Sequence, residues 1–164
     1  MRRRVPHRVT TASVGGYTLV ELVVVMTVMG ILAAYVAPRF WSQQAFSDRG
    51  YADELASALR GAQKAAVITG CPAQLSLSSG GYAAAQQAAS GNTCNTSDTS
   101  WSTPLLGGDG SLIQDSAPAN TTASPTGAFV FDSQGRLSSS PGTTITVGTH
   151  TITIAAGTGL VQVQ

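Results

Sequence analysis

Residues 14–38 read VGGYTLVELVVVMTVMGILAAYVAP and form the longest apolar stretch of the 164-residue chain. Residues 22–38 carry no charge, and the five residues before them carry only the carboxylate of Glu21. Built as a helix at 1.5 Å per residue, residues 17–37 would measure about 32 Å, roughly the thickness of a bilayer core. The stretch therefore predicts a transmembrane helix segment over residues 17–38.

Basic residues are concentrated just before this stretch. Four of the nine Lys and Arg residues lie in the first eight positions, and no acidic residue precedes Glu21. The positive-inside rule then predicts a cytoplasmic N-terminus, with everything after Arg39 on the far side of the membrane. A secretory signal peptide has a similar order of charge and hydrophobicity. Here, however, no A-x-A cleavage site follows the apolar run, and the small residues Gly15 and Gly16 precede it.

Glu21 is the most informative residue of the chain. A carboxylate inside a membrane-spanning segment costs a few kcal/mol on insertion scales and is a functional residue by default. One interpretation is that Glu21 lies near the cytoplasmic end and snorkels to the lipid headgroups. The other interpretation needs a cation in the membrane. A cut after Gly16 would give Tyr17 a free α-amine one helical turn from Glu21, and the two could pair within a chain or between neighbouring chains.

The run Val14-Gly15-Gly16, the residues Tyr17 to Leu22 and the apolar helix together resemble the prepilin signal of type IV pilins and type II secretion pseudopilins. The resemblance implies that a membrane peptidase cuts after Gly16 on the cytoplasmic side and methylates the new N-terminus at Tyr17. Most family members have Phe at this position, so Tyr17 keeps the aromatic ring but departs from the usual residue. Pro38 falls where many pilins have a proline that kinks the helix.

The same long helix is expected to continue past the membrane into a head, with an amphipathic second half over residues 39–69. Apolar residues recur there at spacings of three and four, and charged residues fall mostly between them. Arg60 is expected to lie near Glu54, and Gly70 and Pro72 are expected to end the helix. The expected buried face comprises Tyr51, Leu55, Ala58, Leu59, Ala62, Ala65, Ala66 and Ile68.

Residues 70–164 are expected to form an antiparallel β head. Apolar and polar residues alternate in short runs, and Gly-containing turns separate these runs. A long helix followed only by strands predicts an α+β fold in which the helix covers the sheet. The expected strands lie at residues 75–78, 82–85, 128–131, 136–137, 143–147, 151–154 and 160–163.

A polar region from about residue 86 to residue 127 interrupts these strands. It is rich in Ser, Thr, Asn, Gly and Pro, and its large apolar residues are Trp101, Leu105, Leu106, Leu112 and Ile113. We expect short strands near residues 101–106 and 112–113, and an exposed variable loop elsewhere.

The head resembles the GspH/FimT-type minor pseudopilins. The resemblance rests on residues 51–66, on Phe131-Asp132 with Gly135-Arg136, and on the closing run of residues 158–161. Residues 37–40, with Arg49-Gly50 and Gly70-Cys71-Pro72, are more narrowly similar to the minor pilins of the mannose-sensitive haemagglutinin pilus. The resemblance implies a subunit that assembles through its helix at or near the tip of a filament.

The sequence offers little for catalysis, metal binding or nucleic-acid binding. Only 10% of the residues are charged, and His150 is the only histidine beyond the leader. No Gly-x-Ser-x-Gly elbow occurs, and Asp109 and Asp115 lack EF-hand spacing. From Gly70 onward Arg136 is the only basic residue, whereas DNA binding needs a basic footprint. We therefore expect no enzyme activity, no cofactor, no metal and no nucleic acid.

The two cysteines, Cys71 and Cys94, are expected to form a disulfide, because paired cysteines in an exported chain favour a bridge over free thiols. Metal binding is the alternative, but it would need two more ligands, and His150 is the only histidine left in the mature chain.

The expected function is a minor pilin or pseudopilin, a structural subunit that helps to initiate or cap a type IV pilus or a type II secretion pseudopilus. The alternative is a tip pilin that binds a ligand such as a surface glycan or, less favoured, DNA. The resemblance implies prepilin peptidase, other pilins or pseudopilins, the inner-membrane assembly machinery and, before assembly, membrane lipid as partners. It implies a leader at residues 1–16 and a single-pass protein of the bacterial inner membrane with a periplasmic head, later found in the pilus or pseudopilus.

Overall fold

The computed structural model describes residues 16–40, 43–90, 93–95, 97 and 99–164. The chain divides into an N-terminal unit, residues 1–41, and a head unit, residues 42–164. The first unit contains α1 (Leu19–Phe40), and the head begins with α2 (Gln43–Thr69). α1 runs through Pro38 and ends two residues later, so the kink at Pro38 stays a prediction. No helix among the described residues is both long enough and apolar enough to cross a membrane.

The expected amphipathic character of α2 is confirmed. The sequence places an apolar residue at nearly every third or fourth position, so one side of the helix is apolar. Ile68 was expected on the buried face but is 71% exposed, because the last turn of α2 is exposed to solvent. α2 ends at Thr69, as expected from Gly70. The buried residues of the helix are Tyr51, Ala52, Leu55, Ala56, Ala58, Leu59, Ala62 and Ala66.

The expected pairing of Arg60 with Glu54 is wrong. The guanidinium of Arg60 donates hydrogen bonds from Nε and Nη2 to the backbone oxygen of Val161, at 3.3 and 3.0 Å. Glu54 instead accepts a hydrogen bond from the hydroxyl of Tyr82 at 2.9 Å. At 3.6 residues per turn, a separation of six residues sets two side chains roughly 120° apart around a helix, so they point to different neighbours.

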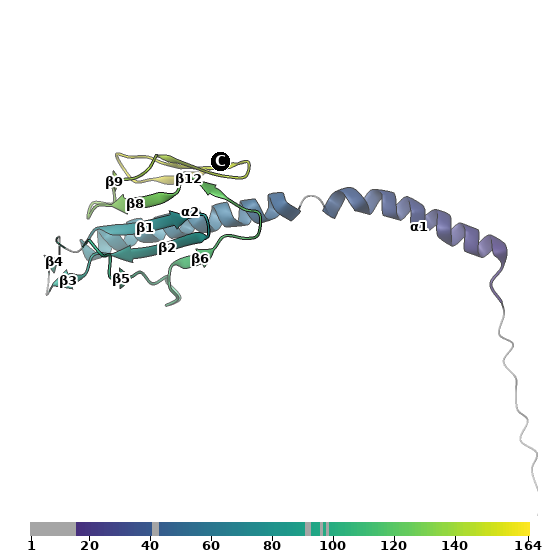
Figure 1. Cartoon of the computed structure of the whole chain (residues 1–164), viewed down its shortest axis with the longest axis horizontal. Helices are drawn as coiled ribbons and strands as arrows, with labels where there is room; N and C mark the ends of the chain where they lie inside the picture. The colour runs from purple at the N-terminus through teal and green to yellow at the C-terminus, as the bar shows by residue number, and fades with distance from the viewer. Residues whose placement is uncertain (1–15, 41–42, 91–92, 96, 98) are drawn as a thin grey trace, which may run out of the picture. The chain divides into compact units, whose positions relative to one another are not determined.

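Two antiparallel sheets pack against α2, which confirms the α+β fold class (Figure 1). The first has the strand order β5-β2-β1-β8-β9, and β6 also pairs with β2. Its strands are β1 (Ala73–Ser78), β2 (Gly81–Gln86), β5 (Thr103–Pro104), β6 (Gln114–Ser116), β8 (Gly127–Phe131) and β9 (Leu137–Ser139). The second has the order β12-β11-β10-β7. Its strands are β7 (Ala123–Ser124), β10 (Thr144–Val147), β11 (His150–Ile154) and β12 (Val161–Val163).

All four expected hairpins form, because short Gly-containing turns join strands whose alternate residues face the helix. β1 pairs with β2, β8 with β9, β10 with β11, and β11 with β12. The inward residues of both sheets and the buried face of α2 make one core. Its largest fully buried side chains are Tyr51, Phe129, Phe131, Leu55, Leu59, Leu75, Ile145, Ile152, Ile154 and Val147.

The polar region is more ordered than the sequence predicts. It contains β3 (Ala89–Ser90) and β4 (Thr93–Cys94), which pair with each other, as well as β5, β6 and β7. The strand expected at Leu112-Ile113 begins instead at Gln114. Residues 105–113 form a hairpin of their own, in which Leu106 and Leu112 are bridge partners. The short strand expected near residues 101–106 forms as β5. The additional order arises because pairing to β2, rather than local alternation, orders β5 and β6.

Candidate functional site

The start of α1 is capped by Thr18. Its backbone oxygen accepts a hydrogen bond from Leu22 N at 3.2 Å, and its Oγ1 accepts one from Glu21 N at 3.2 Å. A Thr at the cap with a Glu three residues later is the pattern that satisfies the unpaired amides of a first helical turn. The helix therefore begins immediately after Gly16 and Tyr17. Gly15, the other expected recognition residue, lies outside the described residues.

Tyr17 precedes α1 by two residues, and Glu21 lies in its first turn. The Tyr17 side chain is 85% exposed, and both residues line a shallow hollow of about 350 Å³ that is otherwise bounded by apolar side chains. The carboxylate also lies in the first helical turn, where negative charge is stabilised by the helix dipole. The two residues that the sequence predicts as a pair thus line one hollow, and their pairing through the α-amine of a cut chain stays a prediction. The other residues of the hollow are Leu22, Val25, Met26 and Met29.

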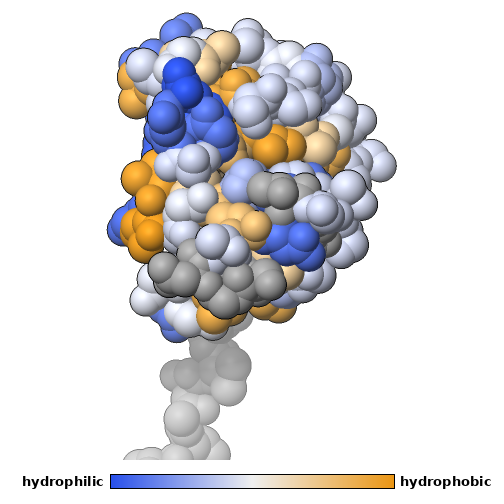
Figure 2. All heavy atoms as spheres, turned by 90° about the vertical axis from the view of Figure 1, so that its left-hand side faces the viewer, coloured by the Kyte–Doolittle hydropathy of each residue, from blue (hydrophilic) through white to orange (hydrophobic). Residues whose placement is uncertain are grey.

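α1 exposes apolar side chains all around its described surface. The exposed fractions run from 49% at Val23, Val25 and Val28 to 79% at Leu19. Exposed apolar area of this extent marks a surface made to contact other molecules. The head, by contrast, buries most of its large apolar residues. The end seen in Figure 2 is mostly pale, weakly polar surface with several apolar patches and a few strongly hydrophilic groups.

Gln63 fastens two turns of the head to α2, and sequence reasoning missed it. Its Nε2 donates hydrogen bonds to Gly135 O at 2.9 Å and to Thr158 O at 3.0 Å. The two turns approach so closely that a Cβ added at Gly159 would fall against Gly135 O. These turns belong to the segments on which the resemblance of the head rests, so one glutamine on the helix connects all of them.

Asp132 shapes the first of these turns. Its carboxylate accepts hydrogen bonds from the backbone amides of Gln134 and Arg136, at 2.9 and 2.8 Å, and pairs with the guanidinium of Arg136 at 3.3 Å. Burial alone would raise the pKa of Asp132, but the hydrogen bonds from these amides and the charge of Arg136 prevail and hold it below the ordinary value.

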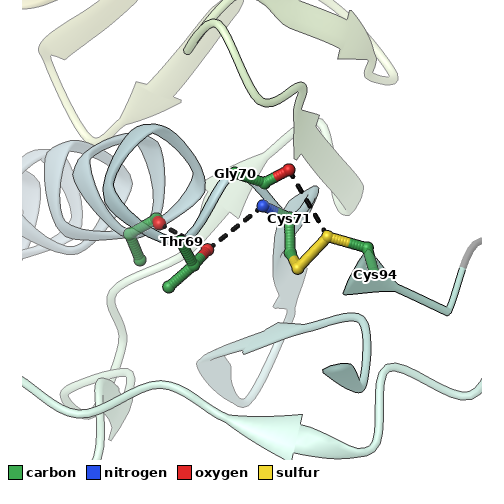
Figure 3. Close-up of a disulfide and its surroundings, with 5 residues drawn as sticks. Thr69, Gly70, Cys71 and Cys94 are labelled. Carbon is green, nitrogen blue, oxygen red and sulfur yellow. Dashed lines mark hydrogen bonds between the residues drawn. A yellow bond between two sulfur atoms is a disulfide. The ribbon is translucent and has the colours of Figure 1, made fainter. Parts of the chain in front are cut away.

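The expected disulfide between Cys71 and Cys94 is confirmed (Figure 3). The two Cα atoms are 5.4 Å apart, within the range that a bridge requires. Thr69 accepts a hydrogen bond from Cys71 N at 3.2 Å and donates one to Ala65 O at 2.8 Å. The bridge therefore joins the polar region to the end of α2, just before β1 begins.

A cluster of tyrosines and carboxyl groups lies between α2 and β6. Tyr82 donates its hydroxyl hydrogen to Glu54, and the rings of Tyr51 and Tyr82 lie 6.1 Å apart. Burial raises the pKa of Tyr82 and of Tyr51. Burial also raises the pKa of Glu54, with Asp115 adding to the rise, whereas the backbone amide of Ser116 lowers the pKa of Asp115. Sequence reasoning missed this cluster, because Tyr82 and Asp115 are far along the chain from Tyr51 and Glu54.

The remaining candidate groups are isolated from one another. No group of three or more His, Cys, Asp or Glu side chains among the described residues could hold a metal ion. His150 begins β11 beside the turn after β10. Asp109 accepts hydrogen bonds from the amide and hydroxyl of Ser111, at 3.0 and 2.7 Å, and so stabilises its own turn.

Comparison with known proteins adds two findings. A family model described as the type II transport protein GspH matches residues 51–163, and a model of the prokaryotic N-terminal methylation motif matches residues 12–37. No curated protein and no solved structure matches the chain. The first match covers more than half of the chain and includes most of α2 and both sheets, and the second includes Gly16, Tyr17 and Glu21. The chain therefore belongs to the GspH family of pseudopilin-like proteins and carries the N-terminal methylation motif.

Proposed function

We propose that the protein is a minor pseudopilin or minor pilin, a structural subunit that helps to initiate or cap a type II secretion pseudopilus or a type IV pilus. The observation that carries the proposal is the pairing of a GspH head with the methylation motif. The exposed apolar surface of α1 supports it, because such a helix needs lipid or other helices around it. The proposed role is structural rather than catalytic.

In this proposal prepilin peptidase cuts after Gly16 and methylates Tyr17. Before assembly the chain is held in the inner membrane, with residues 1–16 in the cytoplasm and the head in the periplasm. The four arginines ahead of the motif support this orientation. The inner-membrane assembly machinery then transfers the chain into the filament, where α1 packs against the helices of other pilins or pseudopilins.

Glu21 is proposed to pair with the α-amine of Tyr17, either its own or that of a neighbouring chain. Both residues line one hollow on α1, and removal of water during assembly strengthens the attraction between opposite charges. Glu21 also lies three residues after the cap residue Thr18, where a Glu or Gln side chain can complete the cap, so the charge and the cap must be separated by experiment.

The test is incorporation into sheared filaments, measured as the amount of the chain per major subunit. Glu21→Ala and Glu21→Gln are both expected to be processed normally but to be lost from filaments. Glu21→Gln can still cap the helix, so its failure isolates the charge. The matched control is Thr27→Val on the same helix, which removes only a hydroxyl bonded to Val24 O. Wild-type levels of Glu21→Gln in filaments would refute the role of the charge.

A further inference from the structure

Residues 103–116 form a strap along one edge of the first sheet. The strap consists of β5, β6 and the hairpin between them, and both of its strands pair with β2. Leu105 is 6% exposed and Ile113 packs against the core. Leu106 and Leu112 face outward, with exposed fractions of 61% and 46%. The strap therefore covers one side of the core with its inner residues, and its release would uncover that side.

Short strands attach the strap to the sheet. β5 has two residues and β6 has three, whereas β1 and β2 have six each. Ala84, in β2, donates its amide to Ile113 O at 2.8 Å and accepts the amide of Leu105 at 3.0 Å. Segments with few backbone hydrogen bonds and much exposed surface open at a lower free energy than central strands. The strap is therefore the part of this sheet in which one additional contact has a large effect.

A carboxyl group of the strap lies beside a carboxyl group of α2. Asp115 is directly opposite Tyr82 in the pairing of β6 with β2, and opposed residues of an antiparallel pair point to the same face of the sheet. Tyr82 is buried on the face that packs against α2, and its hydroxyl donates a hydrogen bond to Glu54 Oε1 at 2.9 Å. Tyr82 thus brings Glu54 next to Asp115, and the two carboxyl groups are hydrogen-bonded to each other.

This contact needs one proton. An ionised carboxylate only accepts hydrogen bonds, so two carboxyl groups can bond to each other only while one of them is protonated. Neither Glu54 nor Asp115 is in an ion pair with a described residue. Arg60 and Lys64 line the same groove, but Arg60 donates its hydrogen bonds to a backbone oxygen. When the proton leaves, two negative charges face each other where the strap meets α2.

The other acidic groups around the pair titrate outside the mildly acidic to neutral range. Burial raises the pKa of Tyr51, in α2, and of Tyr82, in β2. Hydrogen bonds from the hydroxyl and the amide of Ser111 hold the pKa of Asp109, in the hairpin, below its ordinary value of 3.8. His150, the only histidine of the head, belongs to the second sheet. The proton of the carboxyl pair therefore sets how the strap responds to pH in this range.

The direction of the response follows from the two carboxyl groups. Burial raises the pKa of Glu54 above its ordinary value of 4.5, and the amide of Ser116 lowers the pKa of Asp115 below 3.8. The pair holds one proton between these limits, so the contact is strongest in mild acid. It weakens as pH rises through the raised pKa of Glu54. It also weakens as pH falls through the lowered pKa of Asp115, because the second proton removes the charge that the Ser116 amide stabilises.

We propose that Glu54 and Asp115 form a proton-dependent contact that holds the strap on α2 in mild acid and loosens it at neutral pH, so that the exposure of the core beneath the strap depends on pH. This inference goes beyond the proposed function and is independent of it, because it requires only the folded head and no filament.

The test is amide hydrogen exchange of the full-length chain in neutral detergent, with a chelator present so that no divalent cation replaces the proton. Exchange is resolved to single residues and corrected for the intrinsic rate at about pH 5 and about pH 7.5. The protection of the Leu105 and Ile113 amides, which bond to Ala84 O and Leu105 O, is expected to fall about fivefold between the two conditions. The Ile154 amide, bonded to Thr143 O in the second sheet, should keep its protection and report that the head is folded.

Two nearly isosteric variants separate the proton from the fold. In Glu54→Gln the side-chain amide can donate to Asp115 at any pH and still accept from Tyr82, and Asp115→Asn can likewise donate to Glu54. Both variants are expected to keep the strap protected at both pH values. The matched control is Asp53→Asn, because Asp53 is the neighbouring carboxylate on α2 but pairs with Arg49, so this variant should show the wild-type fall.

Equal strap protection of the wild type at both pH values would overturn the inference. A fivefold fall that persists in both Glu54→Gln and Asp115→Asn would overturn it as well, since the charge of the pair would then not be its source. A fall of the same size at Ile154 would show that the whole head, rather than the strap, loosens at neutral pH, and would also contradict the proposal.

Discussion

Replacing Gly159 by Ala tests how the head is held together. Gly159 has φ of +68°, a left-handed conformation that costs a residue with a Cβ about 1–2 kcal/mol. The added Cβ would also fall against Gly135 O and lie 2.6 Å from Gln63 Nε2. Overpacking of this kind costs about 1–3 kcal/mol, and each hydrogen bond of Gln63 that breaks costs about 1 kcal/mol more. The expected destabilisation is therefore about 3–6 kcal/mol, a large share of the stability of a domain this size.

The assay is thermal and urea unfolding of the head fragment, residues 42–164. Gly159→Ala is expected to lower the melting temperature by about 10 °C or more. Gly157→Ala is the matched control in the same turn, because its Cβ would meet no atom within 4 Å. That substitution should leave stability unchanged or raise it slightly, since it reduces the entropy of the unfolded chain. Equal melting temperatures for the two variants would refute the proposed contact between the turns.

Two further predictions concern the same fragment. Cys94→Ser should lower the free energy of unfolding by about 3 kcal/mol, because the bridge joins residues separated by 23 positions. A reductant should lower the stability of the wild type by the same amount and leave the variant unchanged. A wild type that the reductant does not destabilise would contradict the prediction. Burial raises the pKa of Glu54 in the folded state above its ordinary value of 4.5. Between these two pKa values the folded state binds more protons than the unfolded state. The free energy of unfolding should therefore fall as pH rises from 4.5 through the folded-state pKa. Glu54→Gln should flatten this fall in the melting temperature, and an unchanged pH profile would show that Glu54 is not its source.

The sequence predicts the elements of this protein better than it predicts the contacts between them. Local patterns were sufficient for α2 and the four hairpins, because periodicity and Gly-containing turns are properties of neighbouring residues. Ile68 shows the limit of that reasoning. It fits the helical period, yet whether a helix position is buried depends on whether a strand reaches that turn.

The candidate site divides in the same way. The nearness of Tyr17 and Glu21 was predictable, because a separation of four residues is about one helical turn, and their pairing stays a prediction. Gln63, by contrast, is an ordinary polar residue on a helix, and its role depends on two turns that lie 72 and 95 residues further along the chain. The outward leucines of the hairpin were visible as apolar residues in a polar region, but only the pairing to β2 shows which of them face outward.

The central claim is that this chain is a processed pilin-like subunit, and the mass of the mature protein tests it most directly. The chain is purified from membranes of the native host, and its intact mass and N-terminal peptide are measured. The account predicts a protein that begins at Tyr17 and carries one additional methyl group on its N-terminal nitrogen. A mass matching residues 1–164, or a cut after Ala34 or Ala37, would contradict it.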